Sequence, residues 1–199
     1  MRRPAWLLVA CILLMAACSA PGSVKPTVKI GLSAPFEGRD RDLGYEALYA
    51  VRLAVRQCNE AGGIADRYLV EMVALNDFNE AEAAVEQARK MAVDPDVMAV
   101  LGGWSPATAA AAAPMYDQLG LAFVGPTIQL TRVVFPAQGE VAPAFAEAYR
   151  ALSGGVDPGP LAVWAYAQAQ RVLDAIGTAV ESQGAPSRAA VRSLLAGND

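Results

Sequence analysis

Two hydroxyl side chains, those of Ser105 and Thr108, stand three residues apart in the segment Gly-Gly-Trp-Ser-Pro-Ala-Thr at residues 102–108. The segment follows an apolar run, and its proline suits the first turn of a helix. A helix N-terminus leaves backbone N–H groups unpaired and carries a positive dipole end, so it favours a carboxylate. Ser105 would either add a donor to such a site or cap the helix. Capping and binding are compatible, and both interpretations stand.

The same segment also imitates the turn that carries a nucleophilic serine in hydrolases, with Gly103, Ser105 and Ala107 after a strand. However, the sequence contains no histidine. This excludes Ser–His–Asp and Cys–His catalysis and the common histidine-containing zinc sites, and no paired-carboxylate motif stands out. We therefore predict that the protein is not an enzyme, with no catalytic residue, no metal and no cofactor.

The first 18 residues end in a cysteine. A short basic head, an apolar stretch too short to span a bilayer and a small-residue exit precede Cys18, which is typical of a secretory signal. We predict a signal peptide at residues 1–17. Residues 15–18, Met-Ala-Ala-Cys, resemble a bacterial lipobox, which implies that Cys18 becomes a lipidated N-terminus that anchors the chain to a membrane. The alternative is an ordinary secretory signal with a chance cysteine.

Composition narrows the list of partners. The formal charge is −4, and loss of the two arginines of the leader takes it to about −6, so nucleic acid and anionic lipid surfaces are poor partners. Of the three cysteines, Cys11 leaves with the leader and Cys18 is the proposed lipid site. Cys58 remains alone, so we expect no disulfide framework.

The rest of the chain supplies the elements that would position these residues. Residues 18–26 are mostly small and polar with two prolines, and we predict that they form a flexible tether. Apolar patterning then predicts strands and helices in alternation, with strands at 28–32, 68–75, 97–101 and 121–124 and helices at 44–61, 79–92 and 105–117. This order predicts an α/β fold with one doubly wound parallel sheet of about four strands, flanked by helices.

Ligands of such sheets bind at the carboxyl ends of the strands, which draws attention to the loops at 34–42, 76–78, 102–108 and 125–131. Within the second of these loops Asn76-Asp77 is expected to order its own turn, and Asn79, just after it, is a plausible N-cap of the second helix. After Phe135, residues 136–140 form a turn-like joint. Three helical segments follow, at 141–152, 161–180 and 186–195, and are expected to cover the sheet. The predicted domain is thus 27–199, with βα units at 27–135 and covering helices at 141–199.

Several segments resemble one family in the correct order. Lys-Ile-Gly-Leu-Ser-Ala-Pro-Phe-Glu-Gly at 29–38 and Asn-Glu-Ala-Gly-Gly-Ile at 59–64 are similar to the periplasmic leucine/isoleucine/valine-binding proteins of ABC transporters. The resemblance continues through Leu-Asn-Asp, Asp-Pro-Asp-Val-Met-Ala-Val-Leu-Gly-Gly and Gly-Leu-Ala-Phe-Val-Gly-Pro, and into the late helices, at 75–77, 94–103, 120–126, 144–149 and 165–176. It implies the fold of a type I periplasmic binding protein.

The sequence departs from this family in the middle of the chain. Family members have two lobes that close on a ligand by a hinge. Here the early match stops near Phe135 and the late match begins near Val141. We therefore expect a single lobe, with the second lobe missing between the two halves of the first.

The resemblance also implies a ligand site. In the family a Ser-x-x-Thr pair after the third strand helps to hold the ligand's carboxylate, and Ser105 and Thr108 have that spacing. Thr127 lies in the loop after the fourth strand, where the family places a hydroxyl near the charged groups of the ligand. Phe36 lies near the first-lobe wall, with core packing as its alternative. Trp104 would stack on a ligand or plug the exposed face.

The function implied by this resemblance is that of an extracytoplasmic solute-binding lipoprotein, in the periplasm or at the cell surface. Its expected partners are a small-molecule ligand such as a branched-chain amino acid, an ABC permease, and the membrane through the lipid anchor. With one lobe, we expect a weak or non-functional ligand clamp. The alternative is a single-lobe sensor or protein-interaction module that meets another protein with the same face.

Overall fold

The computed structural model describes residues 24–129, 132–135 and 141–197. The signal peptide, Cys18, most of the tether and the joint at 136–140 lie outside these residues. In chain order the elements are β1 (Thr27–Ala34), α2 (Arg41–Glu60), β2 (Leu69–Asn76), α3 (Ala81–Val93), β3 (Val97–Leu101), α4 (Pro106–Gln118), β4 (Ala122–Val124), β5 (Thr127–Gln129), β6 (Arg132–Val134), α5 (Pro143–Ser153), α6 (Pro160–Gln183) and α7 (Arg188–Ala196).

The main sheet has four parallel strands in the order β2-β1-β3-β4. The chain therefore moves outward from β1 in one direction to reach β2 and in the other direction to reach β3 and β4. This reversal of direction places the first crossover helix, α2, on one face and the next two, α3 and α4, on the other. The predicted doubly wound parallel sheet of four strands is confirmed.

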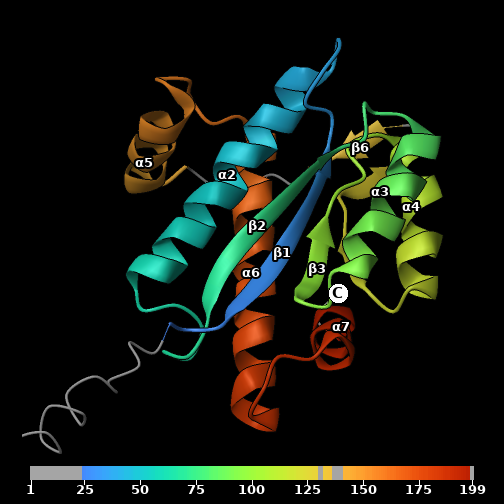
Figure 1. The fold of residues 1–199 in the computed structure, drawn as a ribbon. Coiled ribbons are helices and arrows are strands. Elements are labelled where there is room, and N and C mark those ends of the chain that lie inside the picture. Colours follow the sequence, from blue (N-terminus) through green and yellow to red (C-terminus); the bar gives the residue numbers. More distant parts are fainter. Residues whose placement is uncertain (1–23, 130–131, 136–140, 198–199) are drawn as a thin grey trace, which may run out of the picture.

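Helices cover both faces of the sheet (Figure 1). On one face α3 and α4 enclose a core that contains Met91, Val100 and Tyr116. On the other face α2, α6 and α7 enclose a larger core, in which Ile30, Leu32 and Ile176 are fully buried. Helix α5 packs against α2. The late helices therefore complete the layer that the early βα units leave open.

The central strands are apolar because both of their faces are covered. Every residue of β3 is buried, as expected for a parallel strand between two helical layers. In β1, Gly31 is required by a close approach, because a Cβ built there would lie 2.8 Å from Val100 and 2.9 Å from the sulfur of Met91. The absence of a side chain at Gly31 lets α3 pack close to the sheet.

Two local expectations were wrong. The segment after β4 contains a short antiparallel hairpin of β5 and β6, where we expected a loop. Asn79 is not the N-cap of α3: Glu80 holds that position, and Asn79 adopts a positive φ of 60°. The reason is that Asp77 accepts the backbone N–H of Asn79 (2.9 Å), while the Asn79 amide donates to Asp40 (2.9 Å).

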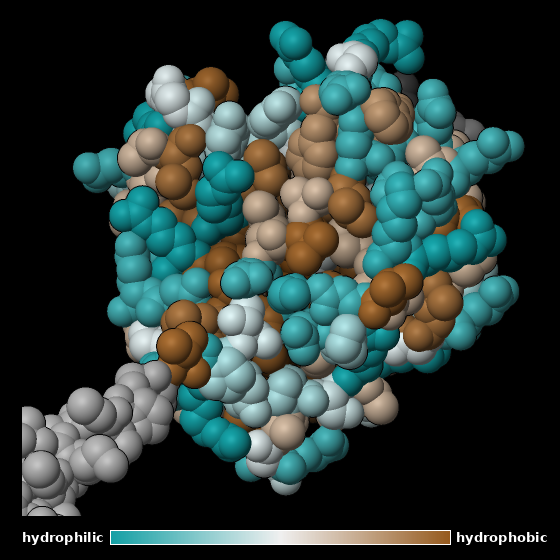
Figure 2. All heavy atoms as spheres, in the orientation of Figure 1, coloured by the Kyte–Doolittle hydropathy of each residue, from teal (hydrophilic) through white to brown (hydrophobic). Residues whose placement is uncertain are grey.

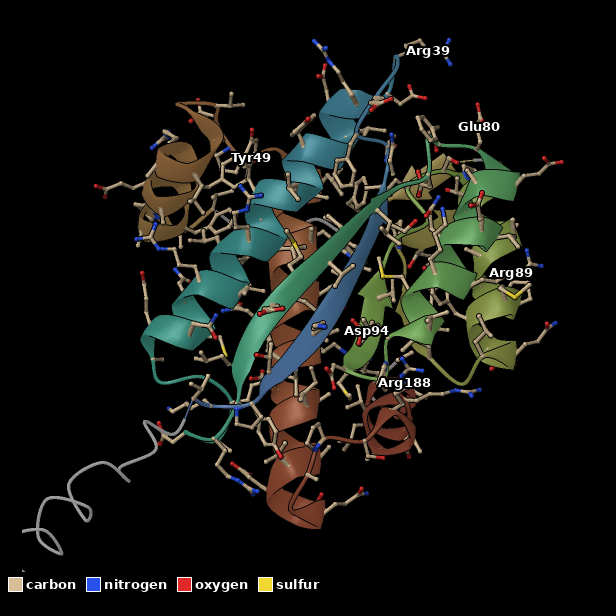
Figure 3. All side chains as sticks on the ribbon, in the orientation of Figure 1. Arg39, Tyr49, Glu80, Arg89, Asp94 and Arg188 are labelled. Carbon is tan, nitrogen blue, oxygen red and sulfur yellow. The ribbon has the colours of Figure 1, made fainter. Side chains whose placement is uncertain are left out.

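The start of the sheet is joined to α7 by a single arginine. The Arg188 guanidinium donates to the backbone oxygens of Val97 (2.8 Å), Ala92 (3.2 Å) and Asp94. The side chain of Asp94 in turn pairs with Lys29 of β1 at 2.8 Å. Asp94 and Arg188 are labelled in Figure 3, where they lie between α3 and α7. The C-terminal helix is thereby fixed to the turn that precedes β3.

Candidate functional site

The carboxyl ends of β1, β2 and β3 are joined by side-chain hydrogen bonds. The Ser33 hydroxyl donates to the carboxylate of Asp77 (2.9 Å), and the Trp104 indole N–H donates to the backbone oxygen of Ser33 (2.7 Å). Ser33 is 2% exposed, Asp77 1% and Trp104 4%. These contacts fix three of the four predicted ligand loops relative to one another.

Asn76 and Asp77 order the turn after β2, as predicted. The Asn76 side-chain oxygen accepts the backbone N–H groups of Phe36 (2.9 Å) and Phe78 (3.0 Å). Burial raises the pKa of the Asp77 carboxyl, and the hydrogen bonds from Asn79 and Ser33 only partly oppose that rise. Both side chains are therefore structural, and Asn76 also positions the loop that carries Phe36.

Ser105 and Thr108 form a capping box at the start of α4. The backbone N–H of Thr108 donates to the Ser105 hydroxyl (3.3 Å), and the backbone N–H of Ser105 donates to the Thr108 hydroxyl (3.1 Å). Thr108 is fully buried, whereas Ser105 is half-buried. The capping interpretation of Ser105 is confirmed. Its role in binding stays a prediction, and the Thr108 hydroxyl is engaged within the helix start.

Trp104 lies inside the protein. Its ring meets that of Trp164 on α6 edge to face, with centroids 5.8 Å apart, and Phe135 contacts the same Trp164 ring at 5.9 Å. This burial agrees with the alternative in which Trp104 fills the end of the sheet rather than stacking on a ligand. Phe36 is half-buried and meets Tyr45 of α2 edge to face at 5.9 Å, so part of its ring remains open at the strand ends.

Sequence reasoning missed an aromatic row that extends from Phe36 across α2 to the late helices. Tyr45 contacts Tyr49, Tyr49 contacts Tyr149 of α5, and both Tyr149 and Tyr166 of α6 contact Phe145, with centroid distances between 4.7 and 6.2 Å. The spacing of Tyr45 and Tyr49, one helical turn apart, was the available signal. The row joins the first ligand loop to the helices that follow the joint.

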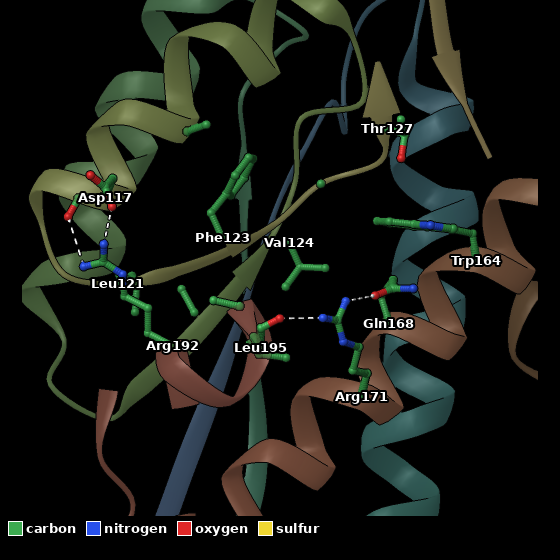
Figure 4. Close-up of a pocket in the computed structure, with 14 residues that line it drawn as sticks. Asp117, Leu121, Phe123, Val124, Thr127, Trp164, Gln168, Arg171, Arg192 and Leu195 are labelled. Atoms are coloured by element: carbon green, nitrogen blue, oxygen red, sulfur yellow. Dashed lines mark hydrogen bonds and ion pairs between the residues drawn. The ribbon is translucent and has the colours of Figure 1, made fainter. Parts of the chain in front are cut away.

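Thr127 lies at a hollow that the other predicted site residues do not line. It is exposed at the start of β5 and lines a hollow of about 510 Å³ that runs along β4 between α4, α6 and α7 (Figure 4). The polar lining includes Gln168 and Arg171, which hydrogen-bond each other at 3.4 Å, and Arg192, which pairs with Asp117. Ser105, Thr108, Phe36 and Trp104 do not line this hollow. The five predicted residues therefore share one edge of the sheet but not one cavity.

The geometry at Ser105 does not favour nucleophilic catalysis. Its backbone is extended, with φ −138° and ψ 159°, whereas a nucleophile elbow holds its serine on a sharp, strained turn. Its side-chain partner is another hydroxyl, and within the described residues no group of acidic or cysteine side chains could hold a metal ion. The arrangement is suited to binding through hydrogen bonds.

Comparison with known proteins decides the family. The model of the family described as periplasmic binding protein matches residues 27–140, which is more than half of the chain. The chain belongs to the periplasmic binding protein family. This is a family of substrate-binding proteins, and membership implies an extracytoplasmic location. No curated protein matches this periplasmic binding protein.

Two solved structures have the same fold. A branched-chain amino acid ABC transporter structure from Rhodospirillum rubrum superposes with a TM-score of 0.73 at 16% identity, over 87% of this chain and 90% of that one. The branched-chain amino acid substrate-binding protein LivJ from Streptococcus pneumoniae, in complex with isoleucine, superposes with a TM-score of 0.70 at 16% identity, over 85% and 88%. None of the helices within the described residues is long and apolar enough to cross a membrane.

Proposed function

We propose that this protein is the solute-binding component of an ABC transporter for branched-chain amino acids, anchored to the membrane through Cys18. Family membership and the fold support a substrate-binding role. The observation that carries the choice of ligand is the start of α4, where a half-buried serine hydroxyl sits at a helix N-terminus on the carboxyl edge of the sheet. Such a position favours a carboxylate, which every amino acid carries.

In this proposal the ligand carboxylate accepts the backbone N–H of Ala107 and the Ser105 hydroxyl, because Pro106 has no N–H and the N–H of Thr108 already donates to Ser105. The partly open ring of Phe36 provides an apolar wall, and Thr127 lies farther along the same edge. One lobe leaves such a ligand half in water, without the burial that gives small-molecule sites their affinity. We expect millimolar affinity, roughly −4 kcal/mol.

Calorimetry with leucine, isoleucine and valine tests this role. Ser105→Ala should weaken the binding further. Because the substitution also removes a helix cap, Ser187→Ala is a matched control: Ser187 caps α7 by accepting the N–H of Ala190, away from the strand ends. Micromolar affinity would contradict the expectation that one lobe gives only a weak site. Binding that Ser105→Ala leaves unchanged would assign Ser105 to capping alone.

The membrane anchor needs its own test. We propose a leader at residues 1–17, a tether at 18–26 and a single folded unit at 27–199. Replacement of Cys18 by Ala should move the protein from the membrane fraction to the soluble fraction. A Cys18→Ala variant that stays in the membrane fraction would contradict lipidation as the anchor and favour an uncleaved leader.

The second candidate function is a single-lobe sensor or interaction module. It is favoured by the state of Thr108 and Trp104, whose polar groups are already hydrogen-bonded inside the fold. The strand ends then offer a shallow surface rather than a closed cavity. Absence of binding by all three amino acids, together with retention of the native fold, would select this candidate, whereas co-purification with a permease pair would favour transport.

A further inference from the structure

The outer edge of β2 is open over most of its length. β2 is the terminal strand of the sheet and pairs only with β1 among the described residues. The backbone N–H of Leu69 donates inward, to Pro26, so the backbone groups of Val70 and of alternate residues after it point outward. Asn59 of α2 covers Val70: its side-chain amide donates to the Val70 oxygen (2.9 Å) and accepts the Val70 N–H (2.8 Å).

Among the described residues, no side chain hydrogen-bonds to the backbone groups of the next two outward positions, Met72 and Ala74. Ala74 is exposed, and the ends of the strand are flanked by two large apolar side chains, Leu69 (38% exposed) and Phe78 (47%). Figure 2 shows apolar side chains gathered over β2 between the polar surfaces of α2 and α3. A long apolar edge with free backbone groups is a template for pairing with another strand.

We propose that this edge pairs antiparallel with the same edge of a second copy, so that two four-stranded sheets join into one continuous sheet. In this arrangement Met72 faces the partner's Ala74 and the two-fold axis passes through Val73. Because β2 is the same in both copies, each hydrogen bond from Met72 to the partner's Ala74 is repeated by symmetry. This interface goes beyond the proposed transport function and does not depend on it.

The neighbouring registers are less favourable. A register centred on Ala74 would set Met72 opposite the partner's Asn76, the last residue of β2, whose side chain already accepts two backbone N–H groups of the turn after the strand. A register centred on Met72 would require the outward groups of Val70, which Asn59 already holds. With the axis at Val73, Phe78 lies opposite the partner's Tyr68, and the two open positions, Met72 and Ala74, are both paired.

Charges on α3 fit the same symmetry. The first half of this helix carries the exposed acids Glu82 and Glu86, and the second half carries the exposed bases Arg89 and Lys90. A two-fold axis perpendicular to the sheet keeps both copies of α3 on one face and runs them antiparallel. The acidic half of one helix therefore meets the basic half of the other, which favours this pairing.

Disulfide trapping tests the register. The backbone groups of Val73 point inward, so the two copies of Val73 form a non-hydrogen-bonded pair, with Cα atoms about 4.5 Å apart, within the range that a disulfide bridges. The full-length Val73→Cys variant should give about tenfold more disulfide dimer under mild oxidation than Val93→Cys, a control at an exposed position (83%) on α3. The wild type reports any dimer formed through native cysteines. Trapping by Ala74→Cys in preference to Val73→Cys would overturn the register.

Sedimentation of the full-length protein in mild detergent tests the association itself. The wild type should dimerise reversibly, and Ala74→Lys should raise the dissociation constant at least about tenfold, because a lysine on an edge strand opposes pairing. Val156→Lys, at an exposed site (60%) after α5, should leave dimerisation unchanged. A wild type that remains monomeric at about 100 µM overturns the proposal, whatever the behaviour of the variants.

Discussion

At the residue scale, the carboxyl of Asp77 is buried with two hydrogen bonds but, among the described residues, without an ion-pair partner. Burial raises its pKa above the usual 3.8. Between the unfolded value and the higher folded value, the folded state holds more protons, so stability falls as pH rises through this window. Asp77 therefore lowers stability as pH rises. Asp94 has the opposite effect, because the hydrogen bond from Lys29 lowers its pKa.

We expect Asp77→Asn to remove this penalty. An amide can still accept the N–H of Asn79 and can donate to the Ser33 hydroxyl. The variant should thus gain unfolding free energy relative to the wild type as pH rises above about 4, measured by urea denaturation from about pH 4 to pH 8. Asp96→Asn, at a side chain 55% exposed, is the control and should show no such trend. A gain that shrinks with rising pH would contradict the burial argument.

The hydroxyl of Tyr116 is buried, and no group of the described residues hydrogen-bonds to it. Because an unsatisfied buried hydroxyl costs free energy, Tyr116→Phe should be neutral or stabilise the protein by up to about 1 kcal/mol. Tyr149→Phe is the comparison, since the Tyr149 hydroxyl donates to the Glu46 backbone oxygen (3.3 Å), and it should lose about 1 kcal/mol. Chemical denaturation measures both. A clear loss at Tyr116 would mean that its hydroxyl has a partner, such as an ordered water.

At the element scale, Arg188 joins α7 to the end of α3 and the start of β3. Arg188→Lys keeps the charge but cannot reach three carbonyl oxygens at once. We expect a loss of about 1–3 kcal/mol in unfolding free energy. Arg192→Lys on the same helix changes an exposed pair with Asp117 and should cost less than about 1 kcal/mol. Equal losses of unfolding free energy in the two variants would contradict the structural role of Arg188.

Asn59 joins the end of α2 to the edge of β2. Asn59→Ala leaves the backbone groups of Val70 without protein partners, and we expect a cost of about 1–3 kcal/mol. Arg56→Ala, which removes an exposed i,i+4 pair with Glu60, should cost less than about 0.5 kcal/mol. Thermal melts of the two variants compare them. If Asn59→Ala melts at the wild-type temperature, the Asn59 side chain does not stabilise the edge of β2.

Long, strongly patterned elements could be predicted from the sequence, and short or hydrogen-bond-determined features could not. β3 was predicted with its observed bounds because all five residues are apolar. The hairpin of β5 and β6 was missed because three-residue strands carry too little pattern, although both are rich in β-branched residues. Asn79 has the right residue type for an N-cap, but the hydrogen bonds that it donates to Asp77 and Asp40 fix it in another conformation.

The candidate site was predictable to a similar extent. The capping role of Ser105 follows from its local sequence, as does the turn at Asn76-Asp77. The burial of Trp104 depends on Trp164, which is 60 residues away in the sequence and lies on a helix after the joint. No local signal could place that contact.

At the scale of the whole molecule, the early and late parts of the chain share one core. Helix α6 packs along α2 and over the sheet, where Trp164, Val172 and Ile176 are buried. A chain that ends at residue 135 would expose this face of β1 and β3. We expect such a truncated chain to lack a cooperative thermal transition and to bind a hydrophobic dye, whereas the full chain melts cooperatively. A cooperative melt of the truncated chain would show that the βα units are stable alone.

The late position of α6 also sets the timing of folding during synthesis. A ribosome must complete most of the protein, through residue 183, before the layer beneath β1 can close. Until then the emerging polypeptide lacks the helix that completes its core. The order of elements therefore delays closure of the core until α6 has been made.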